Sequence, residues 1–405
     1  MNSEGCLCDG FFVSLDTAES LNRDAAQALA AGKTAEARAL LEAAIARDPQ
    51  SPILRLNLAG ARRALGDLAG ALAAVEEALR LQPRLFLALL MKGALLERLG
   101  RTKEAALAYS CAVAQAPPDH ALDEPTRRAL MRARDLTGNY ALALGDFIRS
   151  KINAAWGPAA SERERRRVET FLGTALGTHR VYRQEPTDFH YPELPAIPFW
   201  DREEFPWLTA LEQATPDIRQ EALNVMQYDS GFEPYLQYPD TAPLDQWREL
   251  NRSLRWSAFH FYHYGRRYEE NCARCPKTMA SLAQIPQPWV AQRMPAAMFS
   301  VLKPKTRIPP HTGVANVRLV VHLPLVVPPG CGFRVGNEVR EWRVGQAWVF
   351  DDTIEHEAWN ESDQVRVILI CDVWNPRLSA TERELIRTIL QAMDEFNGFV
   401  QQGAL

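Results

Sequence analysis

The stretch NVRLVVHLPLVV, residues 316–327, alternates polar and apolar side chains and predicts a β-strand that carries Arg318 and His322. His311 precedes this strand in the sequence PPHTG. The strand is followed by a glycine-rich hairpin region (328–345), a strand QAWVF, a turn DDTIEH and a further strand QVRVILICDVW. Short apolar runs separated by Gly and Pro begin at about residue 254 and indicate a strand-rich domain.

Reactive side chains gather in this region. His311 and His356 stand 45 residues apart at the ends of neighbouring strands, so they converge if the sheet rolls into a small barrel. Imidazole suits iron, zinc and copper, and two such ligands leave positions open for substrate and dioxygen. Arg366, ten residues after His356, can hold a carboxylate through two parallel hydrogen bonds. The set describes a non-haem iron oxygenase that uses 2-oxoglutarate, but strand histidines are also common structural residues, so spacing alone leaves both interpretations open.

The N-terminal third repeats with a period of 34 residues. Gly32, Gly66 and Gly100 keep this step, as do three prolines and two sets of three alanines: Pro49, Pro83, Pro117, Ala37, Ala71, Ala105, Ala44, Ala78 and Ala112. Each copy predicts two amphipathic helices, with the glycine ending the first helix and the proline breaking the chain before the next copy. The copies resemble three tetratricopeptide repeats, and residues 124–155 predict a further helical pair that caps the stack. Such a solenoid either holds a peptide or partner protein on its concave face or packs on the next domain or a second copy.

The middle of the chain predicts a connection. Residues 160–178 indicate one more charged helix, and the proline- and aromatic-rich segment 180–207 favours an extended linker. Residues 208–227 indicate another helix. We therefore expect a repeat domain at 18–155, a connection at 156–207 and a second domain at 208–405. In the second domain, Ser379 and Glu382 form the capping box of a C-terminal helix.

Composition restricts the class of protein. The chain has 405 residues and a formal net charge of −4, which gives no general attraction to nucleic acid. It contains no apolar run long enough for a membrane span and no visible secretory signal. Seven cysteines, an odd number, fit a reducing compartment better than a disulfide framework. We expect a cytoplasmic protein without nucleic-acid or membrane partners.

Four stretches between residues 254 and 376 resemble the aspartyl/asparaginyl β-hydroxylase family. They are WSAFHFYHYGRRYEENCARCPKT, HTGVANVRLVVHL, FDDTIEHEAWN and RVILICDVWNP. Residues 194–223 resemble bacterial members that carry tetratricopeptide repeats in front. The resemblance implies an α-helical repeat solenoid followed by a double-stranded β-helix, or jelly roll, with flanking helices. It also implies a dioxygenase that needs Fe(II), 2-oxoglutarate and O2.

The resemblance implies a role for each matching residue. His311 and His356 match the two iron ligands. Arg366 matches the residue that pairs with the distal carboxylate of 2-oxoglutarate, while His322 and Ser300 match further co-substrate contacts. For the substrate, Arg318 matches an arginine that binds its acidic side chain, and Trp256 matches an aromatic near the peptide entrance.

Three positions bear on the reaction and the substrate. Gly313 stands where most enzymes of this class have a third, carboxylate ligand, so water or a halide could take that place. We expect Asp351 and Asp352 to hold the turn before His356 and to support that histidine, rather than to bind metal. Val320 and Ala258 replace a second arginine and a polar residue of the vertebrate members, which weakens the case for the same substrate.

The expected function is hydroxylation of the β-carbon of an Asp- or Asn-type residue in a peptide or protein captured by the repeats. Two alternatives stay open. One is a hydroxylase or halogenase of a free amino acid or small natural product, and the other is a repeat-based interaction protein with an inactive barrel.

Overall fold

The computed structural model describes residues 17–157, 160–227, 231–239, 241–242, 244–290 and 292–397. The chain divides into two compact units, Met1–Ala160 and Ser161–Leu405. Each unit has its own buried apolar core. Across the described ranges, every helix is too short or too polar to cross a lipid bilayer.

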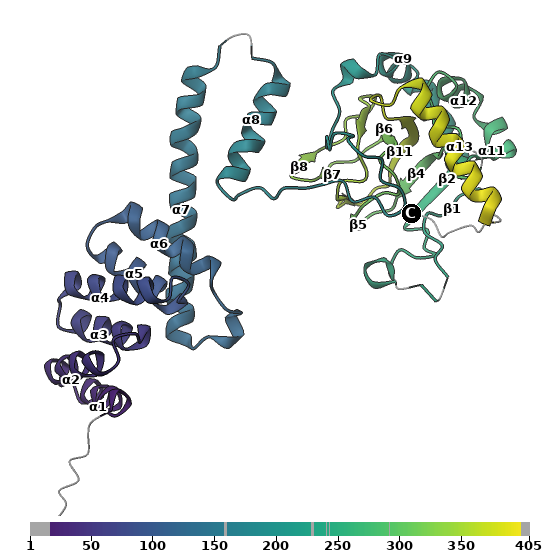
Figure 1. Ribbon diagram of the computed structural model, residues 1–405. Helices are drawn as coiled ribbons and strands as arrows, with labels where there is room; N and C mark the ends of the chain where they lie inside the picture. Colours follow the sequence, from purple (N-terminus) through teal and green to yellow (C-terminus); the bar gives the residue numbers. More distant parts are fainter. Residues whose placement is uncertain are drawn as a thin grey trace, which may run out of the picture. The chain divides into compact units, whose positions relative to one another are not determined.

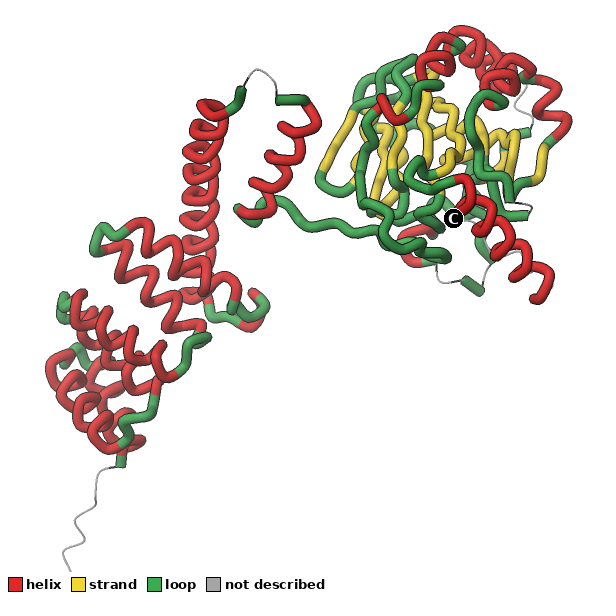
Figure 2. Tube along the Cα trace, turned by 45° about the horizontal axis from the view of Figure 1, so that its top comes forward, coloured by secondary structure: helices red, strands yellow, loops and turns green. Residues whose placement is uncertain are grey.

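The first unit contains three consecutive helical pairs (Figures 1 and 2). The pairs are α1 (Ala18–Ala30) with α2 (Thr34–Arg47), α3 (Pro52–Ala64) with α4 (Leu68–Leu81), and α5 (Phe86–Arg98) with α6 (Thr102–Ala114). Gly32, Gly66 and Gly100 follow the first helix of each pair with φ of 74°, 81° and 74°, a left-handed conformation that favours glycine. The predicted repeats are therefore confirmed.

The predicted cap is one helix rather than a pair. Helix α7 runs without a break from Glu124 to Ala155, after a 3-10 turn η1 (Asp119–Ala121). Its proline, Pro125, stands in the first turn, where proline has no bond to break. Gly138 lies in the middle, and a glycine inside a helix costs only about 1 kcal/mol, which the rest of the helix outweighs.

Most of the predicted connection 156–207 belongs to the second unit, which begins at Ser161. Helix α8 (Glu162–Ala175) begins with a capping box of Ser161 and Glu164. The segment after it pairs with the second unit through isolated bridges, including one between Phe199 and Phe350. Phe199, Trp200 and Phe205 are buried in that unit, the last of them next to the 3-10 turn η2 (Arg202–Glu204). The prolines do keep this segment extended, but its aromatic rings bury too much apolar surface for a free linker.

The second unit is built on two antiparallel sheets. The larger has the order β1-β2-β4-β11-β6-β9, with β3 beside β2, and the smaller has the order β5-β10-β7-β8. The larger sheet's strands are β1 (Glu233–Pro234), β2 (Trp256–His263), β3 (Arg266–Arg267), β4 (Ala297–Leu302), β6 (Arg318–Val326), β9 (Trp348–Phe350) and β11 (Arg366–Trp374). The smaller sheet's strands are β5 (Thr306–His311), β7 (Cys331–Val335), β8 (Glu338–Arg340) and β10 (His356–Asn360). Helical repeats followed by an antiparallel β-domain confirm the expected fold class.

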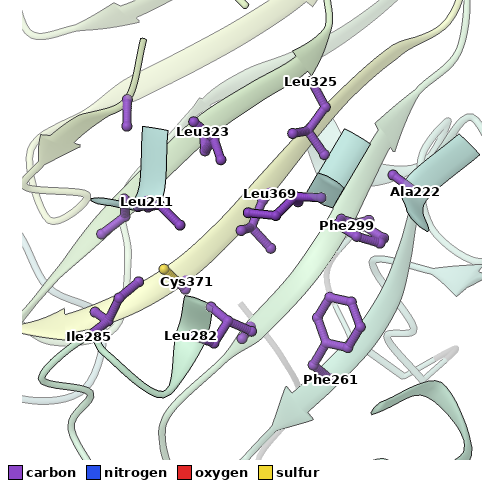
Figure 3. Packing of buried hydrophobic residues seen from close by; sticks show 14 of the residues in the cluster. Leu211, Ala222, Phe261, Leu282, Ile285, Phe299, Leu323, Leu325, Leu369 and Cys371 are labelled. Atoms are coloured by element: carbon purple, nitrogen blue, oxygen red, sulfur yellow. The ribbon is translucent and has the colours of Figure 1, made fainter. Parts of the chain in front are cut away.

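The outer face of the larger sheet packs against helices. They are α9 (Leu208–Gln213), α10 (Thr215–Gln227), α11 (Glu269–Arg274) and α12 (Pro276–Leu282). Leu211, Ala222 and Leu282 from these helices meet Phe299 and Leu369 from the sheet (Figure 3). The other face of the sheet is free to line a cavity. A 3-10 turn η3 (Asp245–Trp247) precedes β2, and α13 (Ala380–Asn397) ends the described chain with the predicted Ser379–Glu382 capping box.

Candidate active site

A cavity of about 890 Å³ lies between the two sheets of the second unit, within the usual size range of small-molecule sites. Both sheets contribute to its wall. The structure brings all seven predicted site residues to this wall: Trp256, Ser300, His311, Arg318, His322, His356 and Arg366.

The two predicted metal-binding histidines face each other. His311 ends β5 and His356 begins β10, and the antiparallel register pairs the two residues directly. Their ring centroids are 4.1 Å apart, at an interplanar angle of 50°. Strand pairing therefore creates the convergence that their distance in the sequence conceals.

Hydrogen bonds set the orientation of both imidazoles. Nδ1 of His311 lies 2.8 Å from the carbonyl oxygen of Pro309, and Nδ1 of His356 lies 3.1 Å from that of Ile354. A carbonyl only accepts, so each Nδ1 carries the proton and each Nε2 keeps a free lone pair. Burial lowers the pKa of His311 to about 3 and that of His356 to about 4. Two neutral imidazoles oriented in this way suit a transition metal.

Gly313 is glycine because of the carboxylate beside it. A Cβ at Gly313 would lie 2.0 Å from Oδ2 of Asp352, which no side chain could share. The Gly313 N–H also donates to the backbone oxygen of Asp352 at 2.7 Å, which ties the His311 loop to the turn before His356. The Oδ1 atom of Asp352 is buried without a hydrogen-bond partner among the described residues.

Asp351 holds that turn, as expected. Its carboxylate accepts from the backbone and hydroxyl of Thr353 at 3.0 and 2.6 Å and from the Gln184 amide at 2.5 Å. Burial raises the pKa of Asp351 to about 6. Asp352 differs from the expectation, because its side chain pairs with Arg318 rather than with the imidazole of His356.

Arg366 is a buried cation, and no described carboxylate pairs with it. Its guanidinium lies 5.0 Å from the Trp342 ring centroid, and its closest polar contact is the Ser300 hydroxyl at 3.5 Å. Within the described ranges its Nε has no hydrogen-bond partner and no carboxylate pairs with it. Burial lowers its pKa to about 10, so it stays charged at neutral pH. Nδ1 of His322, which lines the same cavity, has no hydrogen-bond partner among the described residues, and burial and the charge of Arg366 lower the pKa of this histidine.

Trp256 forms part of the cavity wall near His311. Its side chain is buried, and its indole N–H donates to the Ser300 hydroxyl at 3.2 Å. Its ring stacks on Tyr235 at 3.8 Å and lies 6.3 Å from the ring of His311. Trp256 therefore orients the hydroxyl that Arg366 approaches.

Arg318 is already paired with two buried carboxylates. Its Nη1 lies 2.9 Å from Oδ2 of Asp352, and its Nε lies 3.5 Å from Oδ1 of Asp372. These two charges raise its pKa, against the effect of burial. Sequence reasoning missed Asp372, although a single acid in the apolar strand QVRVILICDVW was a usable signal.

Strand alternation places an apolar floor between the charged groups. Arg318, Val320 and His322 share one face of β6. On the neighbouring strand β11, Ile370 pairs with His322 of β6 on one side and with Met298 of β4 on the other. All of these residues line the cavity. Val320 therefore lies on the wall where a further cation could have stood.

A β-bulge adds two more histidines to the wall. The pairing of β2 with β4 shifts between His260 and Tyr262, and bulges of this kind redirect side chains. As a result His260 and His263 stack at 4.3 Å, and both line the cavity. Burial lowers the pKa of His260 to about 3 and that of His263 to about 4.

The C-terminal helix also reaches the cavity, a contribution that the sequence did not predict. Met393 and Asp394 of α13 line it, and Asp394 forms a bidentate ion pair with Arg293.

Both units of the chain have relatives among known proteins. Residues 212–376 match the family Aspartyl/Asparaginyl beta-hydroxylase, and residues 25–85 and 61–120 match Tetratricopeptide repeat. The chain is 35% identical to human aspartyl/asparaginyl beta-hydroxylase over 200 residues, which are 48% of this chain and 25% of that protein. It is 31% identical to the ornithine lipid ester-linked acyl 2-hydroxylase of Rhizobium tropici over 222 residues, 54% of this chain and 74% of the relative. A solved structure, the first TPR of Spaghetti (RPAP3) bound to an HSP90 peptide, matches 33% of this chain and 99% of its own at 23% identity and TM-score 0.28.

Proposed function

Because this chain belongs to the aspartyl/asparaginyl beta-hydroxylase family, we propose that it is an Fe(II)- and 2-oxoglutarate-dependent dioxygenase. Its reaction would convert a substrate C–H, 2-oxoglutarate and O2 into C–OH, succinate and CO2. The substrate that we propose is a peptide or protein, which is hydroxylated at the β-carbon of an Asp- or Asn-type residue. The chain spans about a quarter of the human relative, so substrate and partners are argued from its own residues.

Arg366 is the observation that carries this proposal. A fully buried guanidinium without a carboxylate is costly unless a ligand brings the anion. One carboxylate of 2-oxoglutarate would meet Arg366 and the Ser300 hydroxyl, which Trp256 orients. Nδ1 of His322, which has no partner in the part of the chain that the structure describes, offers a further hydrogen bond to the same molecule.

His311 and His356 fit a metal by their facing rings and neutral, Nδ1-protonated tautomers. Bound iron would supply the activation of dioxygen, and the protein supplies position and shielding. The apolar floor of Val320, Met298 and Ile370 would hold the substrate chain and exclude water. Asp352 supports hydroxylation over halogenation, because its carboxylate fills the space beside Gly313 and would repel a halide there.

The test is succinate release by the full chain with Fe(II) and 2-oxoglutarate under air, with and without a panel of Asp- and Asn-containing peptides. His311→Ala and His356→Ala should abolish turnover, while the exposed His190→Ala serves as the matched control. Arg366→Met should raise the KM for 2-oxoglutarate more than Arg366→Lys does, because lysine keeps the charge. Unchanged turnover in both histidine variants would show that the proposed iron site is wrong.

The repeats offer a surface for capturing a protein substrate. Their groove has a volume of about 510 Å³ and is lined mainly by apolar side chains, among them Leu56, Leu87, Leu90 and Met91. Leu87→Arg in this groove should raise the KM for a protein substrate and leave that for a short peptide unchanged. Leu107→Arg, at an exposed leucine outside the groove, is the control. Equal effects on both substrates would contradict the capture role.

A further inference from the structure

We propose that the group next to the reacting carbon is a carboxamide and that the cavity rejects the corresponding carboxylate. The inference rests on the proposed function and concerns which member of the Asp/Asn pair this chain accepts. It is carried by the juxtaposition of Arg318 with two buried carboxylates, Asp352 and Asp372, beside the uncharged Val320 on the same strand face.

The positive charge of Arg318 is already neutralised by two carboxylates of the protein. It is buried, and its Nη1 and Nε lie within 3.5 Å of the Asp352 and Asp372 carboxylates. The Oδ2 atom of Asp372 also accepts the Ala296 N–H at 2.7 Å, which fixes that carboxylate in place. A substrate carboxylate at Arg318 would therefore share one cation with two fixed anions.

The other charges on the described part of the cavity wall act in the same direction. Arg293 is held by its ion pair with Asp394, and Asp188 lies at the wall as a further acid. Arg366, the remaining lining arginine, is committed to the co-substrate under the proposed function. A second substrate carboxylate would face an excess of negative charge in a partly desolvated site.

A carboxamide fits the same groups without this repulsion. It offers one acceptor oxygen and two N–H donors. Arg318 carries five N–H donors, of which the carboxylate contacts involve Nη1 and Nε, so it can donate to the amide oxygen. The buried Oδ1 of Asp352 has no partner within the described ranges and can accept from the amide nitrogen. A site that hydrogen-bonds a substrate amide in this way discriminates against the carboxylate, because a carboxylate has no N–H to donate and leaves the acceptor atom of the site unpaired.

Val320 is the position that sets this preference. It stands between Arg318 and His322 on the same strand face, and its side chain lines the cavity. A cation there would give a substrate acid a partner of its own. Valine instead offers contact to carbon atoms and none to an acid.

The experiment uses the full chain with Fe(II), 2-oxoglutarate and two degenerate peptide pools that differ only in a central Asn or Asp. Hydroxylation is read as a 16 Da mass gain, and binding of 2-oxoglutarate is measured separately by calorimetry. We expect the Asn pool to be hydroxylated faster by about a hundredfold. Equal or faster use of the Asp pool overturns the inference. If neither pool reacts while 2-oxoglutarate binds, the inference fails and the co-substrate site stands. If 2-oxoglutarate does not bind, the proposed function itself fails.

Two variants test the cause of the preference. Val320→Arg should reduce the Asn-to-Asp rate ratio by about tenfold or more, while Val320→Met, which adds length without charge, should leave the ratio unchanged. Asp372→Asn, nearly isosteric, should move the ratio in the same direction as Val320→Arg and covers the case in which the arginine variant does not fold. If neither Val320→Arg nor Asp372→Asn changes the Asn-to-Asp rate ratio, the preference does not arise from Arg318 and its two carboxylates.

Discussion

Gly313 lies where the loop after His311 passes closest to the Asp352 carboxylate. Arg318 holds that carboxylate, so it cannot retreat without breaking an ion pair. A methyl group at Gly313 would overlap Oδ2, at 2.0 Å. Absence of a side chain at this position is therefore a packing requirement of the site.

We predict that Gly313→Ala lowers the free energy of unfolding of the second unit by about 1–3 kcal/mol and weakens metal retention. In an Asp352→Ala background the same change should cost less, because the clashing carboxylate is gone. Denaturant unfolding of the four proteins in the cycle measures this coupling. Gly138→Ala, where an added Cβ meets nothing within 4 Å, is the control. Additive effects at Gly313 and Asp352 would contradict the clash.

The sequence selected candidate residues for the site. Spacing alone left a structural role open for His311, His356 and Arg366, and the resemblance to the hydroxylase family is what singled them out. Pairing was not predictable, because the ion pair of Arg318 with Asp372 depends on the register of β6 and β11. The stacking of Trp256 on Tyr235 depends on the packing of neighbouring segments in the same way. The unpaired state of Arg366 and the paired state of Arg318 therefore became visible only in three dimensions.

At the scale of elements, periodic sequence was the reliable predictor. Every repeat places the same side chains in the same environment, so Ala37, Ala71 and Ala105 are all completely buried. Residues 124–155 and 180–207 lack such repetition. The local sequence does not specify whether residues 124–155 form one helix or two, because that depends on the segments packed against them. The same holds for whether residues 180–207 pack against the second unit.

The small residues between the repeat helices give a second prediction. Ala71 of α4 is fully buried, whereas Ala73, two residues on, is exposed. Ala71→Leu should destabilise the first unit by about 1–3 kcal/mol, because the helices cannot separate without losing contacts. Ala73→Leu, an identical change of volume, should cost less than about 0.5 kcal/mol. Thermal unfolding monitored by circular dichroism compares the two, and equal losses would show that close helix approach is not required.

At the scale of the whole molecule, the two units differ in their buried histidines. In the second unit His260, His322 and His356 are buried and His311 is half-buried, and desolvation lowers the pKa of each. The first unit contains one histidine, the exposed His120. Acid should therefore act on the second unit first.

The sign of this effect follows from proton binding. Below the ordinary histidine pKa of about 6.5, these histidines bind protons in the unfolded chain. In the folded unit His311 and His356 bind protons only at about pH 3–4. Between these two pKa values, each such histidine lowers the free energy of unfolding by about 1.4 kcal/mol for every unit by which the pH falls. Asp351, whose pKa burial raises to about 6, and Asp372, whose pKa burial also raises, act in the opposite direction and offset part of the loss.

We predict that the metal-free second unit of the full chain loses several kcal/mol between pH 7.5 and pH 5.5, before most exposed carboxylates titrate. Tryptophan fluorescence of Trp256 and its neighbours should follow this unit during denaturant unfolding, while far-UV circular dichroism is dominated by the helical repeats. His260→Phe replaces a buried ring whose Nδ1 has no partner among the described residues, so it should flatten the pH dependence by one histidine's share. His120→Phe is the matched control in the first unit. A second unit as stable at pH 5.5 as at pH 7.5 would mean that these imidazoles accept protons while folded, and the neutral state that makes His311 and His356 suitable metal ligands would be lost with it.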